Sequence, residues 1–405
     1  MEWIWIFAIA LLCYGIIPGI GAFLVRSRWR SFRREVIRSS FLPIFTYRTL
    51  LELNEAPLNA SPANASSEFR FFGTLEGVQD DNTIWLRSEN IPLSADMTGQ
   101  ELYLLPSGGQ ETEDDMVEEH PPFTGEEIPS IIPWSRVSTL SEGTKVYIAG
   151  PLRKIGGRYM FRAVPPQKLL VVFYEGSDRY LLRRVIWNSR HRNEYWNQFT
   201  PAALGLGALA EMFLTYYFLN TVHLRIPSIL AISAALVPIL PLFPPGIFFF
   251  LLYRWLWSRA RFLRAERDLL RLPLRYFPHS DLSKEVTLSN GERYCCAVLS
   301  TIPWEVVKRR GRVRGTILQK SLRPDSLTSI DKFYWFGRRQ EGDPYPEVSA
   351  DPMVENVVLP GHPDLLSSSC EKQAYKLELL SSIGFGLGFG INLFLTLRIL
   401  ALMVR

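Results

Sequence analysis

The stretch that decides the fold opens the chain, where residues 3–34 read WIWIFAIALLCYGIIPGIGAFLVRSRWRSFRR. Its apolar part, Trp3 to Val25, is long enough to cross a hydrocarbon core, which takes roughly 20 helical residues. A secretory signal peptide would begin with basic residues and end in small ones, and this stretch does neither. We therefore expect a retained transmembrane helix over 1–25, followed by a basic amphipathic helix over 26–43.

Three further apolar stretches predict membrane spans over 202–222, 228–253 and 379–404. The stretch over 228–253 is rich in proline, and proline removes a helical hydrogen bond, so we expect this span to be kinked or broken. Its prolines are Pro238, Pro241, Pro244 and Pro245.

Arginine clusters predict the orientation of these spans. They flank the first span on its C-terminal side, fill a basic juxtamembrane helix over 177–201, and recur in a basic amphipathic helix over 254–272. A juxtamembrane segment over 367–378 adds two lysines, whereas the link between the second and third spans has only Arg225. Because basic flanks stay inside, we expect a multi-pass protein of the cell (plasma or inner) membrane with both termini outside. The arginines predicted to contact anionic headgroups are Arg26, Arg28, Arg30, Arg33, Arg34, Arg254, Arg259, Arg261 and Arg264.

The first long internal segment, 44–176, predicts a cytoplasmic β-rich domain. Phe69–Leu75 with Asn82–Arg87, and Lys145–Ala149 with Tyr159–Val164, have the pattern of hairpins. Five or more short strands suit a small barrel or sandwich, such as an OB-like barrel. An acidic loop over 110–127 lacks the alternating ligands of a calcium loop, which favours a solvated loop over a cation or partner site.

A second cytoplasmic β-rich domain is predicted over 276–366. Its first hairpin should turn at Ser289-Asn290-Gly291, because Asn-Gly is a favoured two-residue turn. A basic run over 308–314 has no accompanying nucleic-acid fold signature, so we predict no nucleic-acid partner.

The two halves follow the same order, which predicts an internal duplication. Each half has a span, a basic amphipathic stretch that stops at a Leu-Pro pair, strand-like sequence, a Val-Val string, a glycine, a Leu-Leu pair and a second span. Coincidence is the alternative, since Val-Val and Leu-Leu are common pairs. The overall prediction is an α+β integral membrane protein with four transmembrane helices and two cytoplasmic β-rich domains.

Polar residues within the predicted spans are the candidate sites. Glu211 lies near the middle of the second span, where a carboxylate costs roughly 2.5–3.5 kcal/mol, and Asn392 lies at a similar depth as a possible partner. Either a proton or ion relay or a plain hydrogen bond between helices would explain Glu211. The glycines of the fourth span have GxxxG spacing, which favours close helix packing over mere flexibility. They are Gly384, Gly386, Gly388 and Gly390.

The sequence contains no catalytic motif, zinc spacing or phosphate loop. The four cysteines and five histidines are scattered, so we predict no metal site, no cofactor and no catalytic residue, and we lean away from an enzyme without deciding the question. The favoured function is a membrane scaffold, adaptor or assembly factor. Its expected partners are the lipid bilayer, anionic headgroups and other membrane or cytoplasmic proteins. The alternative is a small transport or channel component that uses Glu211 and the proline-rich span.

Overall fold

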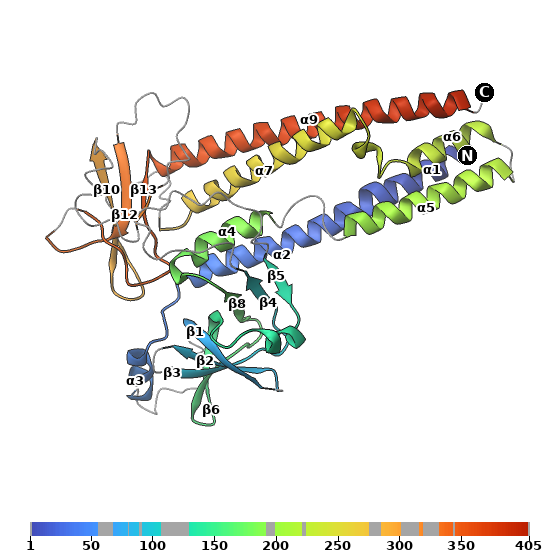
Figure 1. Cartoon of the computed structure of the whole chain (residues 1–405). Coiled ribbons are helices and arrows are strands. Elements are labelled where there is room, and N and C mark those ends of the chain that lie inside the picture. The colour runs from blue at the N-terminus through green and yellow to red at the C-terminus, as the bar shows by residue number, and fades with distance from the viewer. Residues whose placement is uncertain are drawn as a thin grey trace. The chain divides into compact units, whose positions relative to one another are not determined.

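The computed structural model of the chain (Figure 1) describes residues 2–55, 68–79, 81–88, 91–106, 129–191, 199–220, 224–274, 285–300, 316–318, 332–342 and 345–403. The acidic loop 110–127 and the basic run 308–314 lie outside the described residues. The chain divides into two compact units. The helical unit comprises Met1–Ser31, Arg190–Glu266 and Cys370–Arg405, and the β unit comprises Phe32–Ser189 and Arg267–Ser369.

Three stretches of helix are long and apolar enough to cross a membrane, by length and composition: Trp3–Ser39, Ala202–Asn220 and Pro363–Met403. They correspond to the first, second and fourth predicted spans. The helical elements, some shared with the β unit, are α1 (Glu2–Ala10), the π-helical η1 (Leu11–Ile16), α2 (Ile17–Ser39), α5 (Phe199–Asn220), α6 (Arg225–Ala235), the 3₁₀ turn η4 (Leu240–Leu242), α7 (Gly246–Leu270) and α9 (Pro363–Met403).

Over 228–253 the structure has a break, one of the two alternatives expected there, and not a single kinked helix. The chain forms α6, leaves helical structure after Ala235, makes the short turn η4 and starts α7 only at Gly246. Four prolines within eight residues cannot supply the backbone N–H groups that a continuous helix needs. The proline-rich stretch therefore separates two helices instead of bending one.

The basic amphipathic stretches are not separate helices, because α2 continues from the first predicted span to Ser39 and α7 continues to Leu270. Both end just before the Leu-Pro pairs, where the residue before proline disfavours helix. Phe32 and Val36, on the apolar side of α2, are buried in the β unit, and the Phe32 ring stacks on Tyr103 at 4.0 Å. This apolar face contacts protein, which corrects the expectation that it would rest on lipid.

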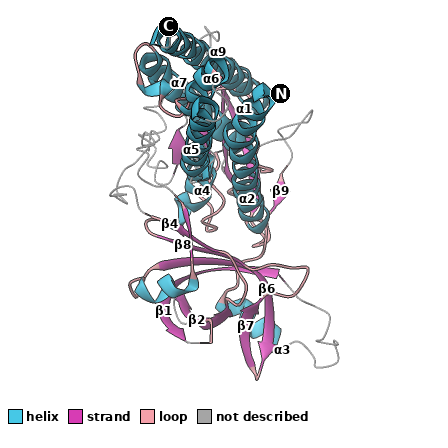
Figure 2. Cartoon of the chain, turned by 90° about the vertical axis from the view of Figure 1, so that its right-hand side faces the viewer, coloured by secondary structure: helices cyan, strands magenta, loops and turns pink. Residues whose placement is uncertain are grey.

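The first part of the β unit contains a five-stranded barrel (Figure 2). Around the barrel the order is β1-β2-β3-β7-β6, and β6 pairs with β1 to close it. Only β3 and β7 are parallel neighbours. The elements of this part are α3 (Tyr47–Glu55), β1 (Glu68–Gln79), β2 (Thr83–Ser88), β3 (Ile91–Asp96), β4 (Leu102–Leu105), β5 (Ser130–Ile132), η2 (Trp134–Thr139), β6 (Lys145–Ile155), β7 (Arg158–Arg162), β8 (Leu170–Tyr174), η3 (Asp178–Tyr180) and α4 (Leu181–His191).

Both hairpins predicted for the barrel are confirmed, as β1 with β2 and as β6 with β7. Inward-facing Phe71, Ile84, Ile148 and Phe161 are almost fully buried, as the alternation of a half-buried strand requires. Beyond the barrel, β8, β4 and β5 extend the same sheet.

The second part of the β unit is a five-stranded sheet of order β11-β13-β12-β10-β9. The predicted hairpin at Ser289-Asn290-Gly291 is confirmed between β9 and β10, with Gly291 at φ +82°. The strands are β9 (Val286–Thr287), β10 (Arg293–Ser300), β11 (Thr316–Leu318), β12 (Lys332–Arg338) and β13 (Asn356–Leu359).

The two parts of the β unit share one arrangement of four strands. In the first part β1-β6-β8-β4 are neighbours with antiparallel, antiparallel and parallel pairing. In the second part β10-β12-β13-β11 follow the same three relations in the same order. The Val-Val strings lie in β8 and β13, and each of these strands is followed by a glycine with positive φ, Gly176 or Gly361, and then by a helix.

Candidate functional site

Glu211 is completely buried in the helical unit, on α5. Among the residues that the structure describes, neither of its carboxyl oxygens has a hydrogen-bond partner, and the hydroxyl of Tyr14 is likewise buried without one. Tyr14 belongs to the π-helical segment η1, and its ring lies so close to Gly207, one turn before Glu211, that a Cβ at Gly207 would fall 2.5 Å from it. The helices therefore approach closely beside Glu211.

Asn392 does not hydrogen-bond to Glu211, contrary to the pairing considered from the sequence. Its side-chain amide donates to the backbone oxygens of Leu240, at 2.5 Å, and Phe243, at 2.9 Å. A Cβ at Gly246 would lie 2.2 Å from the Asn392 amide nitrogen, so only glycine leaves room for this contact. Asn392 thus adds a donor to two carbonyls of the proline-rich break, which also accept from the backbone N–H groups of Phe243 and Ile247.

Among the four glycines of α9, Gly388 contacts a neighbouring helix. A Cβ there would lie 2.5 Å from the Cβ of Phe249 on α7, and α7 runs beside α9 (Figure 1). Around Gly384, Gly386 and Gly390 there is open space within 4 Å. The predicted close packing is therefore seen at Gly388 and not at the other three.

The nine arginines assigned to lipid headgroups divide into two groups. Arg33 and Arg261 are 6% and 7% exposed, and Arg264 forms an ion pair with Glu378 at 2.8 Å, so these three are used within the protein. Burial, together with nearby Arg26, lowers the pKa of Arg261 to about 10. Headgroup contact stays a prediction for the other six, of which Arg26 is half-buried and the rest are exposed: Arg28, Arg30, Arg34, Arg254 and Arg259.

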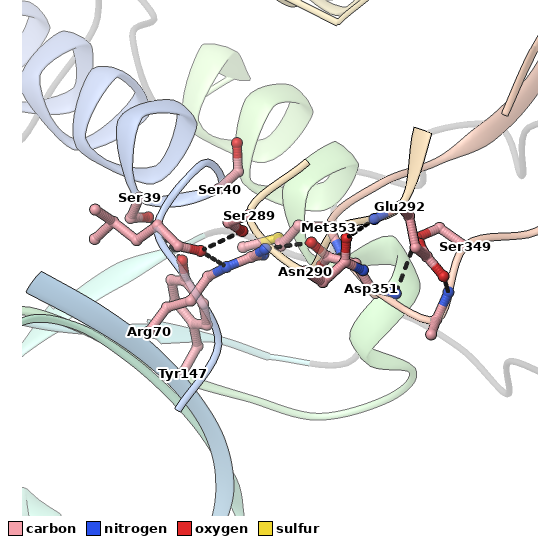
Figure 3. A network of polar contacts seen from close by, with 12 residues as sticks. Ser39, Ser40, Arg70, Tyr147, Ser289, Asn290, Glu292, Ser349, Asp351 and Met353 are labelled. Carbon is pink, nitrogen blue, oxygen red and sulfur yellow. Dashed lines mark hydrogen bonds and ion pairs between the residues drawn. The ribbon is translucent and has the colours of Figure 1, made fainter. Parts of the chain in front are cut away.

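A buried ion pair joins the two parts of the β unit, and the sequence did not reveal it. Arg70 of β1 is fully buried and pairs with Asp351, whose side chain is 2% exposed (Figure 3). The Arg70 Nε also donates to the backbone oxygen of Leu42 at 2.6 Å. The partners are 281 positions apart, so no local spacing could have indicated the pair. The one signal was a charge set between the aromatic residues Phe69 and Phe71.

A second buried pair also involves the segment before β13. Arg183 of α4 meets Glu355 at 3.3 Å, and their side chains are 6% and 2% exposed. Glu355 directly precedes β13, and its backbone oxygen also accepts a hydrogen bond from the Tyr294 hydroxyl. Two charge pairs removed from water thus hold β1, α4 and the second sheet in one arrangement.

The turn that carries Asp351 is held by further polar contacts (Figure 3). The Asp351 carboxylate accepts from the backbone N–H of Met353 at 3.0 Å, and the Ser349 hydroxyl donates to Glu292. Burial raises the pKa of Glu292, but the hydrogen bonds from Ser349 and Arg338 outweigh it and hold that pKa below its usual value of 4.5. The turn that presents Asp351 to Arg70 is therefore held by hydrogen bonds of its own.

A groove of about 570 Å³ lies on the barrel, bordered by α3, β2, β3 and the turn between β6 and β7. Sequence reasoning did not single out its residues, because a groove formed by strand splaying leaves no periodic signal. Among the described residues, His, Cys, Asp and Glu do not gather in groups of three that could hold a metal ion.

Comparison with known proteins gives no further assignment: no family model, curated protein or solved structure matches the chain.

Proposed function

We propose that the chain is a multi-pass membrane scaffold or adaptor that presents the β unit as one rigid body at the inner face of the cell membrane. The observation that carries this proposal is the pair of buried contacts Arg70–Asp351 and Arg183–Glu355. Breaking a buried pair leaves an uncompensated charge at a cost of about 3–5 kcal/mol, so the parts resist separation. A body that cannot flex between its parts displays a fixed surface, which is what an adaptor requires.

The membrane part of the proposal rests on three apolar helices and on the arginine distribution. Exposed arginines of α2 and α7 would lie near anionic headgroups, each contributing roughly 1 kcal/mol near such a surface. Other membrane or cytoplasmic proteins would bind the β unit.

We further propose an OB-like barrel and an internal duplication. In an OB barrel a five-stranded Greek-key sheet closes on itself, and the observed order β1-β2-β3-β7-β6 with closure of β6 on β1 suits this description. The duplication is supported by the shared order of four strands in the two parts of the β unit. The barrel strands β2, β3 and β7 would then be additions to the first copy.

Tags placed near positions 110 and 340 test the orientation. In intact cells neither tag should be reachable by an antibody, and both should become reachable after the membrane is opened. Reachability from outside before opening overturns the inner-face role. Copurification from gently solubilised membranes should then yield a partner whose recovery falls in Asp351→Ala, because a loosened β unit no longer displays one surface.

A second candidate, a proton-coupled transport component, is favoured by one observation: within the described part of the chain, the buried Glu211 carboxyl has no hydrogen-bond partner. The neutral isostere Glu211→Gln separates the two functions. A transport component should lose proton flux in liposomes, measured with an enclosed pH-sensitive dye, whereas a scaffold should retain its copurifying partner. Thr215→Val, one turn further along α5, is the matched control. Wild-type liposomes without proton flux would eliminate this candidate.

A further inference from the structure

The barrel is incompletely closed between β3 and β7. These parallel strands pair at Ser94–Met160, Ala95–Phe161 and Asp96–Arg162, and no pairing between them precedes these positions in the described structure. On either side of the opening, the stretches 91–93 and 157–159 line the groove of about 570 Å³. The groove is thus the opened seam of the barrel, and each strand beside it presents a backbone edge without a β neighbour.

The lining of the seam is aromatic and apolar with a basic rim. Trp85, Pro92 and Tyr159 contribute the floor and wall, and Tyr47 of α3, which is 58% exposed, contributes the opposite rim. Arg158 is exposed at the rim, and no ion pair to it is found among the residues described.

The position of α3 beside the seam is fixed by hydrogen bonds (Figure 2). The Oδ1 of Asn54 accepts from Lys154 Nζ at 3.0 Å and from the Tyr159 hydroxyl at 3.3 Å. Lys154 also lies 5.3 Å from the centre of the Tyr159 ring. These contacts tie α3 to the hairpin of β6 and β7, so the groove exists before any ligand arrives, which lowers the cost of binding.

Three classes of ligand could enter such a groove, and the observations favour an extended peptide. Segment 44–176 has nineteen acidic against ten basic residues, and a net negative field opposes a nucleic acid backbone. Pro92 and the neighbouring aliphatic floor offer few hydrogen bonds for sugar hydroxyls. An extended peptide can use both the unpaired strand edges and the apolar lining of the groove. Such edges accept a further strand, and apolar pockets take its alternate side chains.

We propose that the seam between β3 and β7 is the docking site for an extended segment of a partner protein, with an acidic side chain that meets Arg158. This inference rests on the proposed adaptor function and names the chemistry of its partner. The peptide lies along the opened strands, its apolar side chains contact Trp85 and Tyr159, and its carboxylate pairs with the rim arginine. The volume of the groove falls within the range of about 300–1,000 Å³ that ligand sites occupy.

The test uses the full chain in lipid nanodiscs and a displayed library of random peptides of about 12 residues. A selected peptide, made synthetically, should contain an acidic residue and should bind about tenfold more weakly to Arg158→Glu and to Tyr47→Ala. Arg136→Glu is the matched control, since Arg136 is an exposed arginine on η2 outside the groove, and its affinity should stay within about twofold. Bound peptide should also slow hydrogen exchange in segments 91–93 and 157–159.

Peptides whose affinity is unchanged by both groove variants, or exchange protection elsewhere in the chain, would overturn the proposal. Failure to select any peptide would also overturn the proposal. Groove-dependent binding of a cello-oligosaccharide or an oligothymidylate in place of peptide would do the same. The purified chain binds peptide regardless of which side of the membrane the β unit occupies. The outcome is therefore independent of the tag experiment that tests the proposed function.

Discussion

Removal of Asp351 should destabilise the β unit more than any exposed charge does. Asp351→Ala leaves the Arg70 guanidinium fully buried with no counter-ion and deprives the Met353 N–H of its acceptor. Breaking a buried pair costs about 3–5 kcal/mol, and an unsatisfied N–H adds at least about 1 kcal/mol. We expect a loss of about 4–6 kcal/mol, a large share of the roughly 5–15 kcal/mol that stabilises a typical domain.

A double-mutant cycle isolates the pair itself. Arg70→Met and Asp351→Leu should each cost about 4 kcal/mol, but the double variant only about 2 kcal/mol, because no buried charge is then left uncompensated. The remaining cost comes from the Leu42 carbonyl, which loses its Arg70 donor, and from the Met353 N–H, which loses its acceptor. The coupling free energy should therefore be about 6 kcal/mol.

Urea titration of the full chain in nonionic detergent, with a brief protease pulse at each urea concentration, measures these differences. The matched control is Arg48–Glu52 on α3, a pair 2.9 Å apart whose side chains are 89% and 61% exposed. The cycle Arg48→Met with Glu52→Leu should give a coupling below about 0.5 kcal/mol. If the buried and exposed cycles gave equal couplings, the view of Arg70–Asp351 as a clamp between the two parts would be wrong.

Three other outcomes follow from the geometry. Gly388→Ala should lower the melting temperature, because the added methyl group meets Phe249. Gly384→Ala should keep or raise the melting temperature, because position 384 faces open space. Thermal unfolding in detergent compares the two variants. The pKa of Glu292 is lower in the folded protein than in the unfolded chain, so its stabilising contribution is present above pH 4.5 and is lost as pH falls through the folded pKa. Glu292→Gln should therefore reduce the loss of β-unit stability in acid. Urea titration at a series of pH values measures this loss. Asn392→Leu should cost about 1–3 kcal/mol by removing one hydrogen bond from each of two carbonyls, which keep the backbone N–H donors of Phe243 and Ile247. Protease cleavage in the proline-rich break should then become faster.

Local sequence signals predicted the elements whose causes are local. Alternating apolar residues and glycine turns identified both barrel hairpins, and the Leu-Pro pairs marked the ends of α2 and α7 to within a few residues. Three of the four predicted spans correspond to helices long and apolar enough to cross a membrane. The predicted third span, 228–253, does not form one helix. Hydropathy registers its apolar side chains but not the N–H groups that its prolines lack.

Features that depend on distant partners were not predictable. Arg33 and Arg261 were predicted to contact lipid headgroups, because arginine beside a span usually lies near the membrane surface. Their burial depends instead on residues far away in the sequence. Glu211 and Asn392 shared a predicted depth, but depth does not fix the face of a helix, and Asn392 bonds to the carbonyls near Leu240 instead. The groove on the barrel depends on where pairing between β3 and β7 stops, and the amino-acid sequence of the two strands does not indicate this position.

The placement of the buried charges bears on the proposed duplication. Two similar halves in one chain could pair with the like half of another copy as readily as with each other. The residues before β13 include Asp351 and Glu355, whereas 165–169, before β8, contain Lys168 and no acid. Arg70 can therefore find a counter-ion in the second half but not at the corresponding place in the first. Pairing of two first halves would bury that guanidinium unpaired, so the asymmetry favours pairing of a first half with a second half.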